Sequence, residues 1–153
     1  MKISIVYYSY SGITRKLAED IALITDGKLI ELKPEKLYSF SYNTAVKEVR
    51  KEIEKGYCPS LLEIKETFDD IDTVFIGSPN WFKTFAPPIL SFLRKTDLSG
   101  KTITPFCTHG GGGLGHMVED FKRECSSSDV KRGIALKGNY TFDELKDYIE
   151  KNL

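Results

Sequence analysis

The sequence predicts an α/β fold: a three-layer, doubly wound sandwich with a five-stranded parallel sheet in the middle. Short apolar runs typical of buried strands alternate along the chain with segments of helical periodicity. Strands that alternate with helices imply right-handed crossovers, so the strands run parallel and helices cover both faces. The 153 residues are enough for one hydrophobic core, and we expect a single domain over residues 1–153.

Five apolar runs are the predicted strands. Each is short and is followed by a polar or glycine-containing segment. Their expected ranges are 2–8 (KISIVYY), 28–33 (KLIELK), 72–78 (DTVFIGS), 102–108 (TITPFCT) and 130–136 (VKRGIAL).

Five helices are predicted between and after these strands. Apolar side chains at helical spacing predict helices over 14–25, 43–55, 114–123 and 141–153. Another helix should begin at Pro87 or Pro88, because proline suits the first helical turn. Thr141 and Glu144 have the spacing of a capping box at the start of the last helix.

Composition and charge exclude several classes of function. Hydrophobic residues make up 41% of the chain, and 22 basic residues balance 22 acidic ones, which gives no electrostatic basis for binding nucleic acid. No segment approaches the roughly 20 apolar residues of a membrane-spanning helix, and residues 1–8 lack the pattern of a signal peptide. We therefore expect a cytoplasmic protein with no nucleic-acid partner and no membrane insertion.

The cysteines and histidines do not form a recognisable metal or disulfide pattern. Cys58, Cys107 and Cys125 are odd in number and widely spaced, which predicts reduced thiols. His109 and His116 lie seven residues apart without a cluster of carboxylates, so we expect no metal site.

The first predicted strand ends in SYSGIT (residues 9–14), which leads into a helix. Gly12 permits a turn that exposes backbone N–H groups at the helix N-terminus, and the hydroxyls of Ser9, Ser11 and Thr14 can donate to a phosphate. The loop lacks both the lysine of GxxxxGK[ST] and the pattern GxGxxG, which argues against ATP hydrolysis and dinucleotide binding. On this loop alone, an ordinary helix capped by Ser or Thr is the alternative.

Two further loops follow the third and fourth predicted strands. GSPNWFKTFAPP (residues 77–88) places large aromatic residues between prolines, as expected if they cover a flat ligand; a loop packed under a neighbouring helix is the alternative. CTHGGGGLGH (residues 107–116) has consecutive glycines, which allow the backbone to approach a ligand closely. Ligands of doubly wound sheets bind at the carboxyl ends of strands, so the three loops predict one ligand with a phosphate and a flat polar ring system.

These loops resemble those of the flavodoxin superfamily, in particular its compact FMN-binding members. SYSGIT is similar to the family's phosphate loop, [ST]x[ST]GxT; GSPNWFKTFAPP resembles its flavin loop, GxPxWWGTxPP; and CTHGGGGLG resembles its TSGGSG loop. The resemblance covers nearly the whole chain. It implies the flavodoxin-like strand order 2-1-3-4-5 and one FMN bound tightly without a covalent bond.

The resemblance also assigns a role to each loop. The residues that would hold the 5′-phosphate are Ser9, Tyr10, Ser11, Gly12, Ile13 and Thr14. Those that would flank the isoalloxazine ring are Pro79, Asn80, Trp81, Phe82 and Lys83. Those on its pyrimidine side would be Thr108, His109, Gly110, Gly111 and Gly112.

The sequence departs from the family pattern at a few of these positions. Lys83 stands where glycine is common, and His109 and Gly112 stand where serine is common. A positive charge near the ring would make the reduction potential of FMN less negative, whereas a solvated Lys83 would leave it unchanged.

The resemblance implies a one-electron carrier that shuttles electrons between reductase and acceptor proteins, and we find no set of side chains suited to acid–base or nucleophilic catalysis. The alternative is an enzyme, an FMN-dependent NAD(P)H:quinone or nitro/azo reductase with a small-molecule acceptor, in which Tyr42 and other residues of the 34–62 segment cover the flavin.

A third class of protein, the receiver-type signalling domain, shares the strand order. It needs carboxylates after the first and third strands, where this chain has Tyr7–Ser9 and Ser78–Asn80.

Overall fold

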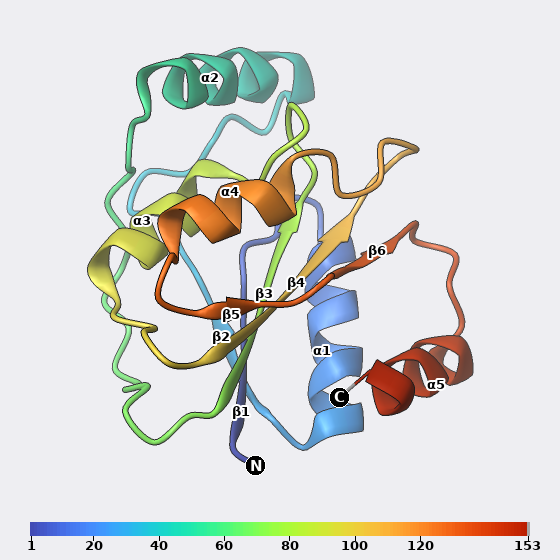
Figure 1. Ribbon diagram of the computed structural model, residues 1–153. Coiled ribbons are helices and arrows are strands. Elements are labelled where there is room, and N and C mark those ends of the chain that lie inside the picture. Colours follow the sequence, from blue (N-terminus) through green and yellow to red (C-terminus); the bar gives the residue numbers. More distant parts are fainter. Residues whose placement is uncertain (153) are drawn as a thin grey trace.

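A parallel sheet forms the centre of the computed structural model, which describes residues 1–152 (Figure 1). Its strands are β1 (Ile3–Tyr7), β2 (Lys28–Glu31), β3 (Thr73–Pro79), β4 (Thr102–Thr108), β5 (Asp129–Val130) and β6 (Ile134–Leu136). The helices are α1 (Ile13–Thr25), α2 (Tyr42–Lys55), α3 (Pro87–Lys95), α4 (Met117–Glu124) and α5 (Phe142–Asn152).

The strand order is β2-β1-β3-β4-β5, with β6 also paired to β4, which confirms the predicted doubly wound fold. One prediction is wrong: the strand expected over 130–136 is two short strands. Gly133 lies between them with φ +87°, a left-handed conformation that interrupts the extended chain. Both short strands pair with β4 in parallel, and together they occupy the edge where one strand was predicted.

The helices begin close to their predicted positions, with one difference. The helix expected from Leu114 begins at Met117, because Gly115 has φ +57° and lies against the backbone of Lys83. Pro87 opens α3 as predicted. The capping box of α5 is also confirmed by two hydrogen bonds of 3.2 Å, from Thr141 N–H to Glu144 and from Glu144 N–H to Thr141 Oγ1. Residue 153, the predicted end of this helix, lies outside the described residues.

Buried side chains form a core on each side of the sheet. Alternate residues along the central strands point to opposite faces. On one face, α1 and α5 cover Ile5, Phe75 and Phe106. On the other face, α3 and α4 cover Val6, Ile76 and Cys107, which are the next residues in sequence after Ile5, Phe75 and Phe106. The strands are therefore buried on both faces, which explains their nearly continuous apolar sequences.

Helix α2 has a different position from the other helices. Figure 1 shows it beyond the carboxyl ends of the strands, above the loop that follows β3. Its buried residues, Ala45 and Val49, belong to the same core as α3 and α4. The helix thus lies over the edge of the sheet where the sequence predicts the ligand site.

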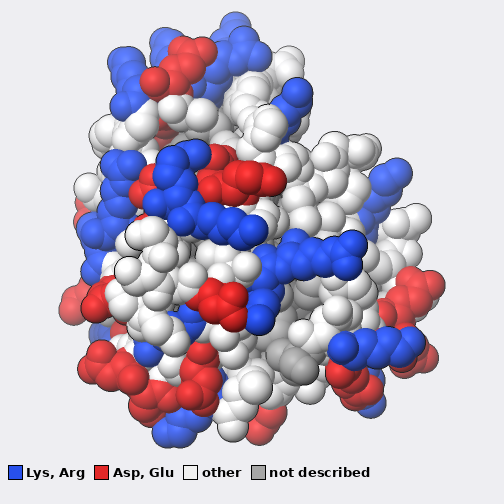
Figure 2. All heavy atoms as spheres, viewed as in Figure 1, with Lys and Arg blue, Asp and Glu red and all other residues white. Residues whose placement is uncertain are grey.

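Charged side chains of both signs are interspersed over the face that carries α3 and α4. Figure 2 shows Lys and Arg concentrated across α4 and the strands beside it. Several are paired: Arg94 with Glu124 (3.2 Å), Arg123 with Asp120 (2.8 Å) and Lys131 with Asp129 (2.8 Å). The pairing reduces the positive field of this face.

None of the helices described within residues 1–152 has the length and hydropathy of a membrane span.

We expect the contact between Gly77 and Phe106 to be necessary for the pairing of β3 with β4. A Cβ atom at Gly77 would stand 2.0–2.5 Å from three carbons of the buried Phe106 ring. Gly77→Ala should therefore lower the free energy of unfolding by about 2 kcal/mol, measured by urea denaturation. Gly138→Ala is the control, because its nearest neighbour is 3.6 Å away. An equal loss in both variants would contradict this explanation.

Candidate functional site

The structure brings the three predicted loops together at the carboxyl edge of the sheet. The hydroxyls of Thr14 and Thr108 are 2.8 Å apart and buried, which joins the first loop to the third. Asn80 joins the second loop to the third: its backbone N–H donates to Thr108 O (2.9 Å) and its side-chain amide donates to Gly113 O (2.6 Å). These hydrogen bonds fix the positions of the loops relative to one another.

The first loop turns sharply at Gly12, whose φ is +97°. Ser9 Oγ accepts hydrogen bonds from the N–H groups of Gly12 (3.1 Å) and Arg15 (3.2 Å), so this hydroxyl stabilises the turn. The buried hydroxyl of Thr14 is directed to Thr108. Two of the three hydroxyls predicted to hold a phosphate therefore have partners in the protein, and Ser11 is left exposed.

The backbone of the same loop offers donors at the positive end of α1. Among residues 1–152, no group accepts a hydrogen bond from the N–H groups of Tyr10, Ser11, Ile13 or Thr14. Unpaired N–H groups at a helix N-terminus attract an anion, because the helix dipole adds to their partial charges. The loop therefore fits a phosphate chiefly through its backbone.

The second loop contains a tight hairpin that sequence reasoning missed. Trp81 and Thr84 exchange backbone hydrogen bonds of 3.0 and 3.2 Å, and the two residues between them have positive φ, +55° at Phe82 and +67° at Lys83. This is the geometry of a type I′ turn, which usually has Asn and Gly in its centre. Neither residue here is glycine, so no residue of the loop indicates the turn. The positive φ at position 83 explains why glycine is common there in the family that the loop resembles.

Several contacts hold the hairpin in place. Thr84 Oγ1 donates to Asp120 of α4, and Lys83 O accepts a 2.6 Å hydrogen bond from His116 N–H. Gly115 lies so close to Lys83 that a Cβ atom there would be 2.5 Å from the Lys83 oxygen. The hairpin is thus fixed against α4 and the segment that precedes it.

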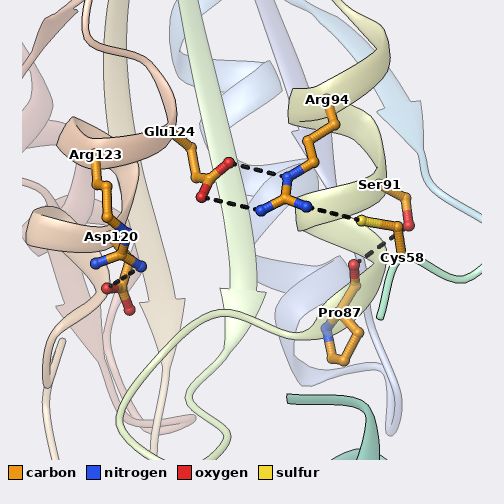
Figure 3. A network of polar contacts seen from close by, with 7 residues as sticks. All are labelled: Cys58, Pro87, Ser91, Arg94, Asp120, Arg123 and Glu124. Atoms are coloured by element: carbon orange, nitrogen blue, oxygen red, sulfur yellow. Dashed lines mark hydrogen bonds and ion pairs between the residues drawn. The ribbon is translucent and has the colours of Figure 1, made fainter. Parts of the chain in front are cut away.

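Further polar contacts link α4, which carries Asp120, to α3 (Figure 3). Asp120 also pairs with Arg123, and Glu124 on the same helix accepts hydrogen bonds from Arg94 of α3. In α3, Ser91 Oγ donates to Pro59 O at 2.6 Å, which ties the segment after α2 to this helix. The network links the helices that support the hairpin.

Aromatic rings surround Trp81. Its ring centroid lies 5.7 Å from Tyr8, 5.6 Å from Tyr10 and 5.7 Å from Tyr38, all in edge-on arrangements. Burial raises the pKa of Tyr8 and Tyr38, so both remain neutral phenols. Sequence reasoning did not single out either residue, because Tyr8 ends a predicted buried strand and Tyr38 is one of several aromatic residues in the 34–62 segment.

Hydrogen bonds connect this aromatic cluster to the segment that carries α2. Tyr10 donates to Ser39 O (2.7 Å) and Tyr38 donates to Glu52 of α2 (2.6 Å). Tyr42, at the start of α2, lies with its ring centroid 6.5 Å from that of Tyr10 and is 63% exposed. The 34–62 segment therefore packs against the aromatic cluster around Trp81; that it covers a bound flavin stays a prediction.

The third loop is exposed at Gly110, Gly111 and Gly112. Gly111 has φ +148° and donates its N–H to His109 Nδ1 (3.0 Å), so the imidazole is turned toward its own loop. A Cβ atom at Gly112 would contact the Asn80 amide at 3.4 Å. The backbone of this loop thus lies close to the second loop with few side chains between them.

Cys58 and Cys125 lie outside the three-loop site, whereas Cys107 lies in β4 at the start of the third loop. All three are free thiols. Burial raises the pKa of Cys107 to about 12 and, with nearby Glu124, that of Cys125 to about 11, so both remain protonated at neutral pH.

The fold and the site define a doubly wound α/β protein that holds an anionic ligand at its carboxyl edge. The family model described as flavodoxin matches residues 2–152, and the chain therefore belongs to the flavodoxin family. No curated protein matches it.

Solved structures give the same picture of the fold. A protein of Bacteroides uniformis assigned as a flavoprotein has a TM-score of 0.89 at 24% identity, over 97% of each chain. A flavoprotein of Lactobacillus acidophilus in complex with FMN has a TM-score of 0.80 at 26% identity, over 97% of this chain and 98% of that one. The apo-form of the flavoprotein from that species gives 0.68 at 27% identity, over 94% and 95%.

The left-handed conformation of Lys83 predicts a stabilising substitution. Lys83→Gly should raise the free energy of unfolding by about 0.5–1 kcal/mol, because glycine adopts this φ without the steric cost of a Cβ atom. Urea denaturation at neutral pH measures the change. Lys83→Ala is the matched control, since it removes the charge and keeps Cβ. An equal gain in the alanine variant would show that charge, rather than backbone strain, is the cause.

Proposed function

We propose that this chain binds one FMN at the three-loop site and serves as a one-electron carrier between reductase and acceptor proteins. The observation that carries the proposal is the set of unpaired N–H groups at the start of α1, next to an aromatic hairpin and a glycine-rich loop. Membership of the flavodoxin family supports it, as does the FMN complex of the relative with 26% identity.

The hydrogen bonds of the first loop support binding of the phosphate mainly by the backbone. The N–H groups of residues 10, 11, 13 and 14 would bind the phosphate oxygens, with the exposed Ser11 hydroxyl as a further donor. Ser9 and Thr14 support the loop through their own hydrogen bonds. The ring would lie beside residues 79–83 and 108–112.

FMN supplies the redox chemistry when it is bound, because its ring accepts and releases electrons singly or in pairs. The protein supplies position and environment. The carbonyl of Asn80 accepts no hydrogen bond from residues 1–152, so it is available to accept one from an N–H group of the ring. Tyr8 and Tyr38 stay uncharged and exclude water from the region around Trp81.

One observation favours a second function, an FMN-dependent NAD(P)H reductase for quinone, nitro or azo compounds. Helix α2 and the hairpin enclose an apolar cavity of about 120 Å³, lined on the hairpin side by Asn80, Trp81 and Phe82. A cavity next to a flavin can hold a small acceptor, which a carrier does not need.

The phosphate assignment predicts different effects on FMN and riboflavin. Ser11→Glu should weaken FMN binding at least about tenfold, because the new carboxylate repels the phosphate. Riboflavin, which has no phosphate, should bind the variant and the unmodified protein equally, as measured by quenching of flavin fluorescence. Ser126→Glu adds the same charge at an exposed position outside the loops and should leave both ligands unaffected. Equal weakening of riboflavin would place the phosphate elsewhere.

Anaerobic reduction separates the two proposed functions. A carrier loaded with FMN should remain oxidised for minutes with NADH or NADPH alone. Photoreduction should then deliver electrons in two resolved steps. The visible absorbance spectrum monitors both reactions. Free FMN at the same concentration is the control. Rapid bleaching by either nucleotide would contradict the carrier and support the reductase.

A further inference from the structure

The cavity beneath α2 is separate from the place where the three loops meet. Its walls are Tyr42, Ala45, Val46, Val49, Asn80, Trp81 and Phe82. Neither residues 9–14 nor residues 108–113 line it. The cavity therefore lies on the α2 side of the hairpin and shares only residues 80–82 with the proposed FMN site.

The size and walls of this cavity suit one aromatic ring. Apolar cavities of about 150 Å³ are known to bind benzene, so about 120 Å³ with an open mouth can hold a single ring. The three fused rings of a flavin are too large for it. Tyr42, Trp81 and Phe82 provide aromatic surfaces, which favour stacked or edge-on contacts with a ring.

A positive charge stands at the edge of the cavity. The guanidinium carbon of Arg50 lies 5.0 Å from the centroid of the Phe82 ring, and Phe82 is 40% exposed. No carboxylate among residues 1–152 lies within 4.0 Å of the Arg50 nitrogens, whereas Arg15, Arg94 and Arg123 each pair with a carboxylate. Arg50 is thus free to pair with an anionic group of a ligand.

The wall of the cavity also offers one hydrogen-bond acceptor. The Asn80 side chain uses its amide N–H on Gly113 O, whereas its amide oxygen accepts no hydrogen bond from residues 1–152. A hydroxyl or amino substituent on the ring would satisfy this oxygen.

We propose that the cavity binds a single aromatic ring that carries an anionic group, with the ring against Trp81 and Phe82 and the anion paired with Arg50. The inference rests on the proposed function only in that the ligand and FMN would share the wall formed by residues 80–82. The ligand class itself follows from the volume, the aromatic lining and the unpaired Arg50.

Three probes of nearly equal size test the charge preference: 4-nitrobenzoate, neutral 4-nitrobenzamide and 4-nitrobenzylammonium. Trp81 is the only tryptophan in the chain, so its indole N–H gives one NMR signal that reports binding to the FMN-loaded protein. We expect the anion to bind roughly threefold more tightly than the neutral probe and the cation to bind most weakly. Arg50→Gln should abolish this preference, whereas the control Lys47→Gln, on the same helix, should keep it.

A second variant tests the location. Val46→Phe fills the cavity and should prevent 4-nitrobenzoate from shifting the Trp81 signal, while the bound-flavin absorbance shows that the fold is intact. An unchanged shift in this variant, or no shift in the unmodified protein at millimolar probe, would overturn the proposal. Displacement of 4-nitrobenzoate by FMN from flavin-free protein would also overturn it, because the cavity would then belong to the FMN site. Binding of the probe without any binding of FMN would instead reject the proposed function and leave this inference standing.

Discussion

The pairing of β3 with β4 determines where the functional loops lie. Their register runs from Thr73 opposite Thr102 to Pro79 opposite Thr108, and the hydrogen bond from Asn80 N–H to Thr108 O continues it one residue beyond the strands. The second and third loops therefore begin as extensions of the sheet. The first loop is held to them by the buried pair of threonine hydroxyls, so the geometry of the whole site derives from the sheet.

Helix α2 decides how the site can be approached. In an ordinary crossover a helix covers a face of the sheet, whereas α2 lies over its edge, where the Tyr38–Glu52 hydrogen bond and the bond from Ser39 N–H to Glu48 hold it. This position buries the inner side of the hairpin and encloses a cavity that a ring could enter. The position of α2 bears on the choice between the two proposed functions, because it creates the space that the small acceptor of a reductase would need and that a carrier does not need.

Sequence reasoning predicted the fold well because buried parallel strands and amphipathic helices have periodic apolar patterns. It failed where the backbone conformation is set by tertiary contacts. The turn at Phe82–Lys83 contains no glycine, and the break at Gly133 occurs inside an apolar run. The three loops were predictable from their composition, but Tyr8, Tyr38 and Asp120 were not, since only the packing of distant segments brings them to Trp81 and Thr84.

The strained hairpin explains why so many contacts converge on it. Two non-glycine residues with positive φ cost about 1–2 kcal/mol each, and a free loop would relax. Here Asp120 holds Thr84, His116 holds the Lys83 carbonyl, and Arg50 lies over Phe82. These contacts offset the strain and keep Trp81 in one position between the proposed flavin site and the α2 cavity. A rigid wall shared by two sites keeps Trp81 in the same position whichever site is occupied, because moving it would break these anchors.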